Sequence, residues 1–545
     1  MTSIVFQYVY FLTTALFLVS LVRNAVFWTF LWQNKEYRID RMFIHFRETG
    51  QGRSIFIGIE SWLKNFLIIF FFLAIFNQEL YRVFPLLVLG VYSLTAIKVI
   101  WEIKNKKIRS PLITPKIVVI IFLSFAITSV LYTIPILDYY FWLLFLEHFL
   151  TITIAVLFML FSIPSDFYKD TLINKAIKKR AQYKNVTVIG ITGSYGKGSV
   201  KEFLYTTLSH KFNVLKTAST YNTPIGIART ILSGLDAKKR IFIVEMGAYK
   251  TGDITFMSHM VKPKMGIITA VNDQHVSLFG SIDKIKKSKY ELVESLPKDG
   301  IALFNGNNEV THKFYQKCKK KKILYFADYN NLGIRADLRA FDIKENKFSL
   351  SFSLIFKNQN LGKFHVNLLG RHNIQNVLPC IAVAYELGMN SSEIKFALAK
   401  IVPMEKTMQP FTNLKRVTLI DDTYNANPDA AIVACEYMKV YKGKKVYVLQ
   451  PMIELGKHAG QDHYRVAKIV SGIANVFFVT NGNFLKDIKK GVGEGSRNCV
   501  LQVATPKAIS DYILKNCKVG DVAVFEGKES AFPLNLLDKD PVHSI

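Results

Sequence analysis

The sequence predicts an α-helical transmembrane bundle of about five spans, followed by two soluble α/β domains. Three observations support this fold class. Residues 1–165 hold most of the long apolar runs, whereas the rest has the mixed composition of soluble α/β proteins. The stretch GITGSYGKGSVKE, at 190–202, joins a β-branched run to a helical one through a glycine-rich turn. After about residue 405, strand-like runs alternate with helical stretches.

Five apolar segments make up the membrane part. Each is near or above the ~20 residues that a helix needs to cross the hydrocarbon of a bilayer. The segments are 4–32, 55–76, 83–101, 117–137 and 139–163. The first is too long, and too poor in small cleavage-site residues, to be a signal peptide, so we expect it to stay in the protein.

The distribution of lysine and arginine predicts the orientation of this bundle. Basic residues gather between the first two segments, between the third and fourth, and after the fifth, whereas the other two connections are nearly uncharged. They are Lys35, Arg38, Arg41, Arg47, Arg53, Lys104, Lys106, Lys107, Arg109, Lys116, Lys175, Lys178, Lys179 and Arg180. The positive-inside rule therefore predicts a multi-pass cell-membrane protein with the N-terminus outside and residues 165–545 in the cytoplasm.

Some ionisable side chains fall within these segments. Glu147 and His148 lie in the fifth, where such groups either serve a function or pair within the bundle. Lys64 and Lys98 lie near helix ends, so we expect their ammonium groups to reach the membrane interface.

Composition bears on the possible partners. The net charge of +29 would suit nucleic-acid binding. No RNA- or DNA-binding motif accompanies it, so we expect no nucleic-acid partner and attribute part of the charge to attraction for anionic membrane lipids. The five cysteines include no CxxC pair, which argues against a disulfide framework or zinc site and suits a reducing compartment.

The glycine-rich turn is predicted to bind nucleotide phosphates. VTVIGI has the pattern of a buried strand, and VKEFLYTTLSHKF has helical spacing. Backbone N–H groups of such a turn wrap phosphates, Lys197 adds positive charge, and a hydroxyl reaches Mg²⁺. Because Gly198 follows the lysine, that hydroxyl would come from Ser199. The alternative is a glycine-rich turn with an incidental lysine.

Two later strands end in candidate magnesium ligands. IFIVEMG ends at Glu245, and GIITAVNDQH ends at His275. A carboxylate or histidine at a strand end beside a phosphate loop can bind a metal, although a solvated glutamate and a structural histidine are the alternatives. Lys289, in KKSKYE, would by itself be taken for a surface lysine.

Eight motifs follow one another in a specific order. They are GSYGKGSVKE, YNTPIGIARTIL, VEMGAYKTGDI, ITAVNDQHVSLFGS, KSKYE, LLGRHNIQN, IDDTYNANPDA and MIELG. Their order, over about 186–540, resembles the Mur ligase family, and is most similar to its MurF type, which joins D-alanyl-D-alanine to a UDP-muramoyl-tripeptide. The resemblance implies an ATP-dependent acid–amino-acid ligase with a P-loop ATPase-like central domain and a Rossmann-like C-terminal domain. It implies an amino-acid or dipeptide donor and a muramoyl-peptide acceptor as partners.

The resemblance also implies roles for individual residues. Lys197, His275 and Lys289 are the implied catalytic residues, and Lys289 matches a lysine that is carbamylated to become a carboxylate-like metal ligand. The implied phosphate-loop contacts are Gly193, Ser194, Gly196, Lys197, Gly198 and Ser199, and the implied ligands of two Mg²⁺ ions are Ser199, Glu245, His275 and Lys289. Arg371, His372, Asn373 and Asn376 fall in the adenine-side motif, Asp422 matches an acid that contacts the ribose, and Tyr424, Asn425, Asn427 and Pro428 belong to a loop that closes over the nucleotide.

Two features depart from the family pattern. The GKGS form is similar to the folylpolyglutamate synthase branch of the superfamily, so we expect the loop to work. In VPMEKTMQ, related ligases carry an arginine at or near Thr407, and Lys406 could replace its charge but not its bidentate geometry.

The expected domains are a transmembrane domain at 1–165, a central ATP-binding domain at 186–403 and a C-terminal domain at 404–545. Soluble MurF enzymes begin with a small domain that holds the UDP-sugar end of the substrate, and this chain has no room for one before 186. One hypothesis is that the bundle presents a lipid-linked or membrane-delivered acceptor, with Arg38, Arg41 and Arg47 near its phosphates. The alternative is that the bundle only anchors the ligase.

Two other functions stay open at this point. A poly-γ-glutamate synthase-type membrane ligase of the same superfamily would polymerise glutamate without a muramoyl acceptor. A non-catalytic ATP-binding scaffold of an envelope complex would bind ATP and release no phosphate.

Overall fold

The computed structural model describes residues 3–35, 37, 39–48, 55, 58–105, 108–134, 138–218, 221–272, 276–452, 455, 458–496, 498–537 and 540–541. The chain divides into two compact units, Met1–Asp170 and Thr171–Ile545. The described part of the first unit is helical, and the second unit contains two α/β domains, each built around its own sheet.

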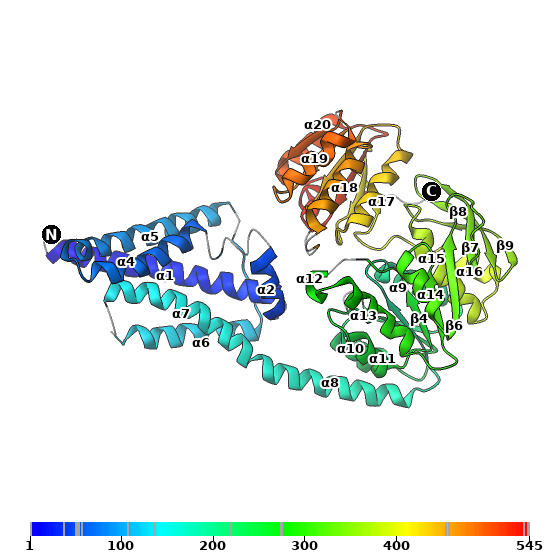
Figure 1. Cartoon of the computed structure of the whole chain (residues 1–545), viewed down its shortest axis with the longest axis horizontal. Coiled ribbons are helices and arrows are strands. Elements are labelled where there is room, and N and C mark those ends of the chain that lie inside the picture. The colour runs from blue at the N-terminus through cyan, green and yellow to red at the C-terminus, as the bar shows by residue number, and fades with distance from the viewer. Residues whose placement is uncertain are drawn as a thin grey trace. The chain divides into compact units, whose positions relative to one another are not determined.

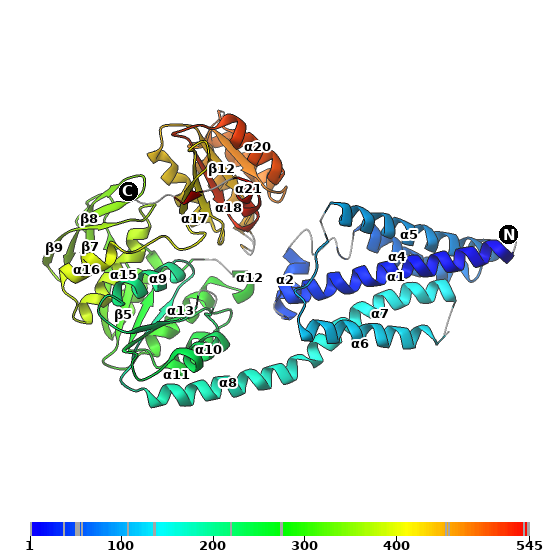
Figure 2. The same ribbon diagram turned by 180° about the vertical axis from the view of Figure 1, so that it is seen from behind.

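The helices of the first unit form a bundle. They are α1 (Ser3–Asn34), α2 (Ile39–Glu48), α4 (Ile59–Ala74), α5 (Gln78–Lys104), α6 (Pro115–Tyr132) and α7 (Tyr139–Leu160), and α8 (Ser162–Gln182) leads out of the unit. The long helices α1, α5, α6 and α7 run side by side with α4 (Figures 1 and 2). Asn77, Thr114 and Asp138 fix the starts of α5, α6 and α7, because each side chain accepts backbone N–H groups of the first turn.

Within the described residues, four helices are long and apolar enough to cross a membrane: Ile4–Asn34, Gln78–Lys104, Pro115–Tyr132 and Tyr139–Leu160. The remaining expected segment, 55–76, contains α4, which has only 16 residues and is shorter than the ~20 residues of a full span. It is short because the extended Gly58 precedes the helix, which begins at Ile59. The predicted number of five spans is therefore not confirmed.

A buried ion pair joins α4 to α7 inside the bundle. Nζ of Lys64 lies 2.7 Å from Oε1 of Glu147, and the hydroxyl of Ser20 donates to the same oxygen. His148 also pairs within the bundle, with Nε2 3.0 Å from Oδ1 of Asn65. The expectation that Lys64 reaches the membrane interface is wrong, because a carboxylate inside the bundle already pairs with its ammonium group.

Further ion pairs extend this network toward the start of α4. Arg23 on α1 contacts Glu60 at 3.0 Å and Glu102 at 3.1 Å. Nζ of Lys98 lies 2.8 Å from the other carboxylate oxygen of Glu60. Glu60 is near the start of α4, and its partner Lys98 is near the end of α5. The two helices therefore run antiparallel and lie together along most of α5. Cations and anions are equal in number across the network.

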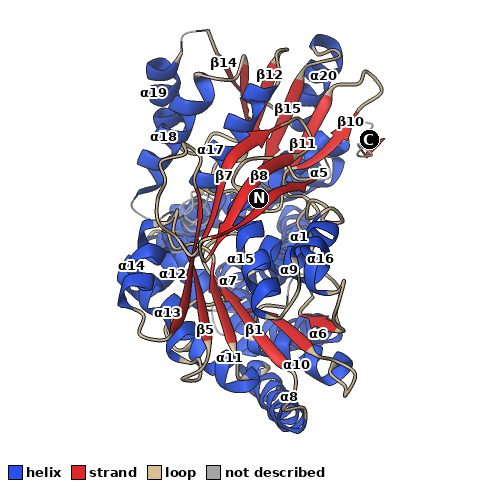
Figure 3. Ribbon diagram, turned by 90° about the vertical axis from the view of Figure 1, so that its right-hand side faces the viewer, coloured by secondary structure: helices blue, strands red, loops and turns tan. Residues whose placement is uncertain are grey.

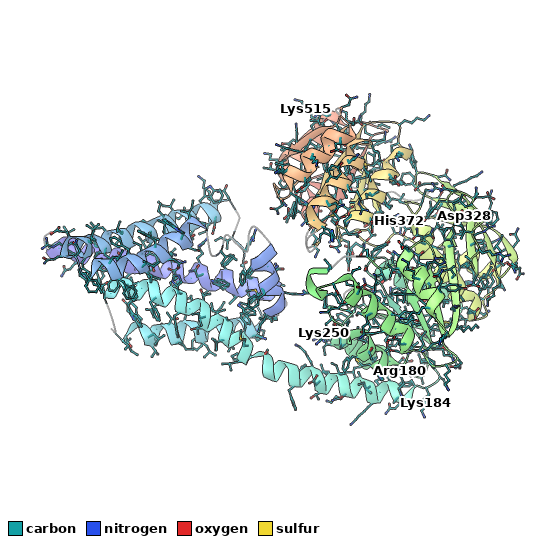
Figure 4. The ribbon with its side chains drawn as sticks, in the orientation of Figure 1. Arg180, Lys184, Lys250, Asp328, His372 and Lys515 are labelled. Atoms are coloured by element: carbon teal, nitrogen blue, oxygen red, sulfur yellow. The ribbon has the colours of Figure 1, made fainter. Side chains whose placement is uncertain are left out.

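The C-terminal half of α8 belongs to the core of the second unit. Ile173 and Ala176 are buried against the helices and strands of the central domain. The guanidinium of Arg180 is buried too (Figure 4). It donates to the backbone carbonyls of Tyr183 (2.7 Å), Val186 (3.2 Å) and Val261 (3.0 Å). These three bonds fix the end of α8 to the loop before the first strand.

The central domain is a three-layer α/β structure (Figure 3). Its nine-stranded sheet has the order β2-β3-β1-β4-β5-β6-β7-β8-β9, parallel from β2 to β7 and antiparallel beyond. The strands are β1 (Thr187–Thr192), β2 (Val214–Lys216), β3 (Ile241–Glu245), β4 (Met265–Ile268), β5 (Ile301–Asn305), β6 (Lys321–Ala327), β7 (Leu338–Glu345), β8 (Leu350–Phe356) and β9 (Gln359–Val366). Strands such as β3 and β5 are buried at every residue, which explains their continuous apolar sequences.

Helices cover both faces of this sheet. One face packs against α9 (Lys197–Leu208), α15 (Asn373–Glu386) and α16 (Ser391–Leu398). The other packs against α10 (Pro224–Gly234), α11 (Asp253–Val261), α13 (Ile282–Glu294) and α14 (Glu309–Lys317), and the short α12 (Val276–Phe279) precedes α13. Because parallel strands end at one edge of a sheet, the turns after β1, β3 and β4 come together there.

The C-terminal domain has a seven-stranded sheet of order β14-β13-β12-β15-β11-β10-β16, parallel from β14 to β11. The strands are β10 (Gln409–Thr412), β11 (Thr418–Asp422), β12 (Lys445–Leu449), β13 (Val476–Val479), β14 (Val500–Val503), β15 (Val522–Glu526) and β16 (Asp540–Pro541). One face packs against α17 (Pro428–Tyr437), α18 (Ala459–Ser471) and α19 (Leu485–Gly495), and the other against α20 (Pro506–Asn516) and α21 (Ala531–Asn535).

Candidate active site

The glycine-rich turn occupies the end of β1 and leads into α9. Gly193 has φ 151° and Gly196 has φ 78°, backbone conformations that residues other than glycine rarely adopt. A Cβ at Gly193 would lie 2.1 Å from Oγ1 of Thr269, and one at Gly196 would lie 2.7 Å from Oδ1 of Asn376. Both positions therefore require glycine, and the loop passes close to the end of β4 and to α15.

Neighbouring strand ends hold the loop in shape. The backbone N–H of Ser194 donates to the carbonyl of Ala270 at 2.7 Å, and the N–H of Asn272 donates to the Ser194 hydroxyl at 3.1 Å. The hydroxyl of Thr269 donates to the carbonyl of Tyr195. The residues just after β4 thus determine the loop's conformation, which leaves the start of α9 open to an anion.

Lys197 is the first residue of α9, and its ammonium group lies over the loop. Nζ donates to the carbonyls of Gly193 at 2.8 Å and Ser194 at 3.0 Å. Burial lowers the pKa of Lys197, and the nearby charge of Glu245 opposes that shift. The side chain can exchange these carbonyls for phosphate oxygens with a small movement.

Glu245 ends β3 beside this lysine and is held from two sides. Its Oε2 lies 3.1 Å from Nζ of Lys201, and its Oε1 accepts a hydrogen bond from Nδ2 of Asn222 at 3.2 Å. A Cβ built on Gly198 would lie 3.9 Å from Oε2, so the carboxylate faces the first turn of α9. Sequence reasoning missed Lys201, although its place one helical turn after Lys197 puts both on one face of α9.

The structure describes only one of the next two predicted metal ligands, Ser199 and His275. Ser199 is buried in the first turn of α9, whereas His275 lies outside the described residues. Among the residues that the structure describes, no three His, Cys, Asp or Glu side chains gather into a metal-binding group. Glu245 is thus the acidic metal-ligand candidate that the structure places at the loop.

Lys289 on α13 is buried beside the phosphate loop rather than lying on the surface. Its side chain is about 5% exposed, and it lines a small cavity of about 70 Å³ together with Lys197, Asn222 and Tyr249. Burial, and then the charge of Lys197, lowers the pKa of Lys289 to about 7, against the opposing charges of Asp253 and Glu291. Its amine therefore loses its proton near neutral pH.

The predicted adenine-side residues flank the start of α15. Nδ2 of Asn373 donates to the carbonyl of Leu369 at 2.7 Å, and Nδ2 of Asn376 donates to Oδ1 of Asn373 at 2.9 Å. Burial lowers the pKa of His372 to about 4. Asn376 is adjacent to the phosphate loop at Gly196, and His372 is a half-buried side chain that is neutral at neutral pH.

Arg371 lies at the edge of the same region and packs on an aromatic ring. Its guanidinium is 5.0 Å from the ring centroid of Tyr329 and donates to that residue's carbonyl at 3.2 Å. Nε2 of Gln375 donates to the Tyr329 hydroxyl at 2.9 Å. Sequence reasoning missed Tyr329, which follows β6 without any motif of its own.

Asp422 ends β11 next to Glu526, its register partner on β15. Both side chains are buried, and no donor reaches either carboxylate oxygen of Glu526. Oδ1 of Asp422 accepts the N–H of Met408 at 3.1 Å. Burial raises the pKa of Asp422 to about 7, although its interactions with Glu526 and with the N–H of Met408 lower it. Burial, and then the charge of Asp422, raises the pKa of Glu526 well above its usual range, so the two buried carboxyls share a proton.

The pair should make the C-terminal domain less stable as pH rises from acidic to neutral values. Because both folded pKa values are raised, the pair's contribution to stability is present below about pH 4 and is lost as pH rises through about 7. Glu526→Gln cannot ionise, so we expect a smaller fall in the domain's thermal midpoint between pH 5 and 8 than in the parent. Calorimetry of the full-length protein measures this.

Glu529→Gln is the matched control, because it removes a carboxylate from the same loop. Unlike Glu526, this carboxylate accepts hydrogen bonds from the side chains of Thr480 and Asn481. Equal slopes against pH for Glu526→Gln and the parent protein would contradict the shared-proton interpretation.

The loop after β11 reaches the central domain. Nδ2 of Asn272 donates to Oδ2 of Asp429 at 3.1 Å. Burial, and then the charge of Glu245, raises the pKa of Tyr424. Asn425 is exposed, whereas Asn427 and Pro428 are buried and form the cap and first position of α17.

The segment that departs from the family pattern lies at the start of the C-terminal domain. Thr407 has a buried hydroxyl oxygen that no hydrogen bond reaches, and Lys406 has φ 58° with a half-exposed side chain. The N–H of Tyr424 donates to the Lys406 carbonyl at 2.9 Å. Sδ of Met404 would lie 3.3 Å from a Cβ on Gly198, so this segment also packs on the first turn of α9.

Comparisons with known proteins agree with this architecture. The family models of the Mur ligase middle domain and of the Mur ligase, glutamate ligase domain match residues 191–384 and 408–529. The UDP-N-acetylmuramoyl-tripeptide--D-alanyl-D-alanine ligases of Buchnera aphidicola and Escherichia coli are 31% and 29% identical, over 60% and 56% of this chain and 72% and 67% of theirs.

Solved structures share the fold. MurF from Acinetobacter baumannii superposes with a TM-score of 0.60 at 22% identity, covering 68% of this chain and 79% of that one. MurF from Thermotoga maritima in complex with ADP gives 0.60 at 23% identity, covering 68% and 83%. The resemblance in the sequence is confirmed: the chain belongs to the Mur ligase family.

Proposed function

We propose that this chain is a membrane-bound, ATP-dependent ligase of the MurF type that joins D-alanyl-D-alanine to a muramoyl-tripeptide. The observation that carries the proposal is the meeting of the Gly193–Ser199 loop, Glu245 and Lys289 at one sheet edge of a Mur ligase fold. This reaction belongs to the synthesis of peptidoglycan precursors.

Amide formation at neutral pH needs activation, because a carboxylate oxygen is a poor leaving group. A carboxylate oxygen of the acceptor attacks the γ-phosphorus of ATP, forming an acyl phosphate and releasing ADP. The donor amine then attacks the acyl carbon, phosphate leaves, and the amine loses a proton. Lys197 and the start of α9 offset the negative charge while the loop holds the phosphates in line.

The residues present fit magnesium, because Glu245 offers the oxygen ligand that Mg²⁺ prefers and faces the phosphate loop. We assign Ser199, His275 and a carbamylated Lys289 as further ligands of two ions. When bound, these ions would reduce the repulsion between the carboxylate and the triphosphate.

We expect Lys289 to carry a carbamate in bicarbonate buffer. Its pKa of about 7 leaves a neutral amine, which attacks CO₂ and releases a proton. Carbamate should therefore increase from pH 6 to pH 8, following an about tenfold rise in neutral amine. NMR with ¹³C-bicarbonate measures it. Lys289→Met should lose the signal, and Lys286→Met, which changes a partly exposed residue of the same helix, should keep it. A signal that survives Lys289→Met contradicts the assignment.

For the nucleotide we assign the loop Gly193–Ser199 to the phosphates, the α15 motif to adenine and Asp422 to the ribose. The α15 motif comprises Arg371, His372, Asn373 and Asn376. The loop with Tyr424, Asn425, Asn427 and Pro428 would close over the nucleotide, and the hydrogen bond from Asn272 to Asp429, just after this loop, supports this. The parallel order of β14 to β11, with helices on both faces, supports a Rossmann-like C-terminal domain.

We retain the domain limits 1–165, 186–403 and 404–545, and a multi-pass topology with the N-terminus outside and the ligase in the cytoplasm. This orientation requires α4 to cross the bilayer, which its contacts along α5 support. The bundle then either presents a lipid-linked acceptor or anchors the ligase. Of the arginines suggested for lipid phosphates, Arg38 and the side chain of Arg47 lie outside the described residues, and Arg41 lies on α2.

The decisive experiment measures ADP and phosphate release by the detergent-purified full-length protein with Mg²⁺ and bicarbonate. Soluble UDP-muramoyl peptides and lipid-linked precursors are compared as acceptors, with D-alanyl-D-alanine or L-glutamate as donor. A requirement for a muramoyl acceptor and D-alanyl-D-alanine together supports the proposal. Release with glutamate alone would instead indicate a poly-γ-glutamate synthase-type ligase, and ATP binding without release would indicate a scaffold.

A further inference from the structure

We propose that Lys201 is a positioning residue that holds the Glu245 carboxylate in the orientation that binds magnesium–nucleotide. The inference rests on the proposed function, because it assumes that the loop binds a nucleotide with Mg²⁺. It adds a residue that takes no part in the phosphate contacts or in the ligand set assigned above.

The burial of Lys201 is the first argument. Its side chain is only 1% exposed although it carries a charge, whereas Lys216, which ends β2 and pairs with Glu202 of the same helix, is 29% exposed. A buried ammonium group persists only when a charge and hydrogen bonds compensate it. Nζ of Lys201 has Oε2 of Glu245 at 3.1 Å, the carbonyl of Ala218 at 3.3 Å and, at the longer distance of 3.6 Å, Oε1 of Glu202.

The geometry around Glu245 is the second argument. Lys201 takes one carboxylate oxygen, and Asn222 takes the other. The backbone N–H of Glu245 donates to the hydroxyl of Thr217 at 3.1 Å, which fixes the main chain at the same point. A carboxylate held at both oxygens and at its backbone has one orientation, and its remaining lone pairs face the first turn of α9.

Lys201 also joins the two elements that the nucleotide must contact. It projects from α9, which begins at the phosphate loop, and it reaches the end of β3. Loss of the ammonium group would leave the buried Glu245 carboxylate held by Asn222 at one oxygen alone, so its orientation would be less restricted. A positioning role therefore predicts weaker magnesium-dependent binding, whereas a merely neutralising charge predicts stronger Mg²⁺ binding after its removal.

The test compares Lys201→Met with the matched control Lys216→Met in the full-length protein. Lys216 pairs with Glu202 on α9 and does not contact Glu245. Titration calorimetry measures ADP affinity with and without Mg²⁺. The ratio of the ADP affinity with Mg²⁺ to that without Mg²⁺ should be at least tenfold smaller in Lys201→Met than in the parent protein. The affinity of Lys201→Met for magnesium-free ADP should change less than threefold. Lys216→Met should match the parent in both affinities. An unchanged or larger magnesium effect in Lys201→Met overturns the inference.

A double variant covers the case in which Lys201→Met does not fold. Lys201→Met with Glu245→Gln removes both buried charges, a change that folded proteins tolerate better than loss of one partner. If Lys201 acts through Glu245, the double variant and Glu245→Gln alone share the same magnesium effect, and a further loss in the double variant overturns the inference. Failure of the parent protein to bind ADP would instead refute the proposed function.

Discussion

A Lys197→Met variant is expected to lose ATP-dependent ligation, with kcat lower by roughly 10³-fold or more. Its ammonium group is the positive charge nearest the loop's carbonyls, at 2.8 Å and 3.0 Å from those of Gly193 and Ser194. Methionine fills similar volume without the charge that the transferred phosphoryl group needs. The loop itself should persist, because Ser194 and Tyr195 are held by Ala270 and Thr269 rather than by the lysine.

The measurement is ADP release under saturating substrates, together with the thermal midpoint as evidence of folding. Lys211→Met is the control, because Lys211 lies just after α9 and pairs with Glu393 at the surface. Ligation by Lys197→Met within tenfold of the parent would show that the loop does not bind the transferred phosphate.

The second large effect concerns the membrane bundle. Glu147→Leu is expected to destabilise it by about 3 kcal/mol, because Lys64 would lose its partner at 2.7 Å and keep only the longer contact with Glu60 at 3.5 Å. Lys64→Met combined with Glu147→Leu should recover most of that loss, since the double variant leaves no uncompensated charge. Reversible unfolding in mixed micelles of the full-length protein measures the three stabilities.

An exposed ion pair provides the control for this experiment. Glu79→Gln breaks the contact of Glu79 with Arg82 at the start of α5, where both side chains are largely exposed. We expect a change within about 1 kcal/mol. Equal stability of Glu147→Leu and the parent, or no recovery in the double variant, would show that the pair contributes little.

The sequence predicts the site best where the chemistry is local. The phosphate loop lies within about ten consecutive residues whose glycines, lysine and flanking strand and helix are all visible in order, and the structure places them together. Glu245 could also be expected at the loop, because it ends a predicted strand and parallel strands end at the same edge of a sheet.

Contacts between distant parts of the chain were not predictable in this way. Lys201 pairs with a carboxylate 44 residues away, and Glu526 meets Asp422 only through the register of β11 and β15. Lys64 near a helix end suggested exposure, because the sequence marks Glu147 as an ionisable residue of another span but does not show that the two residues pair. The length of α4 depended on the backbone at Gly58, which apolar composition does not report.

The buried end of α8 limits how this gene could exchange parts with its relatives. Recombination at the short connection before β1 would replace Ile173, Ala176 and Arg180 with a foreign segment. Loss of Ile173 and Ala176 would expose an apolar face of the central domain. Loss of Arg180 would leave three backbone carbonyl groups without their hydrogen-bond donor. The two halves are therefore inherited best as one piece, and a viable exchange would have its breakpoint upstream of Thr171.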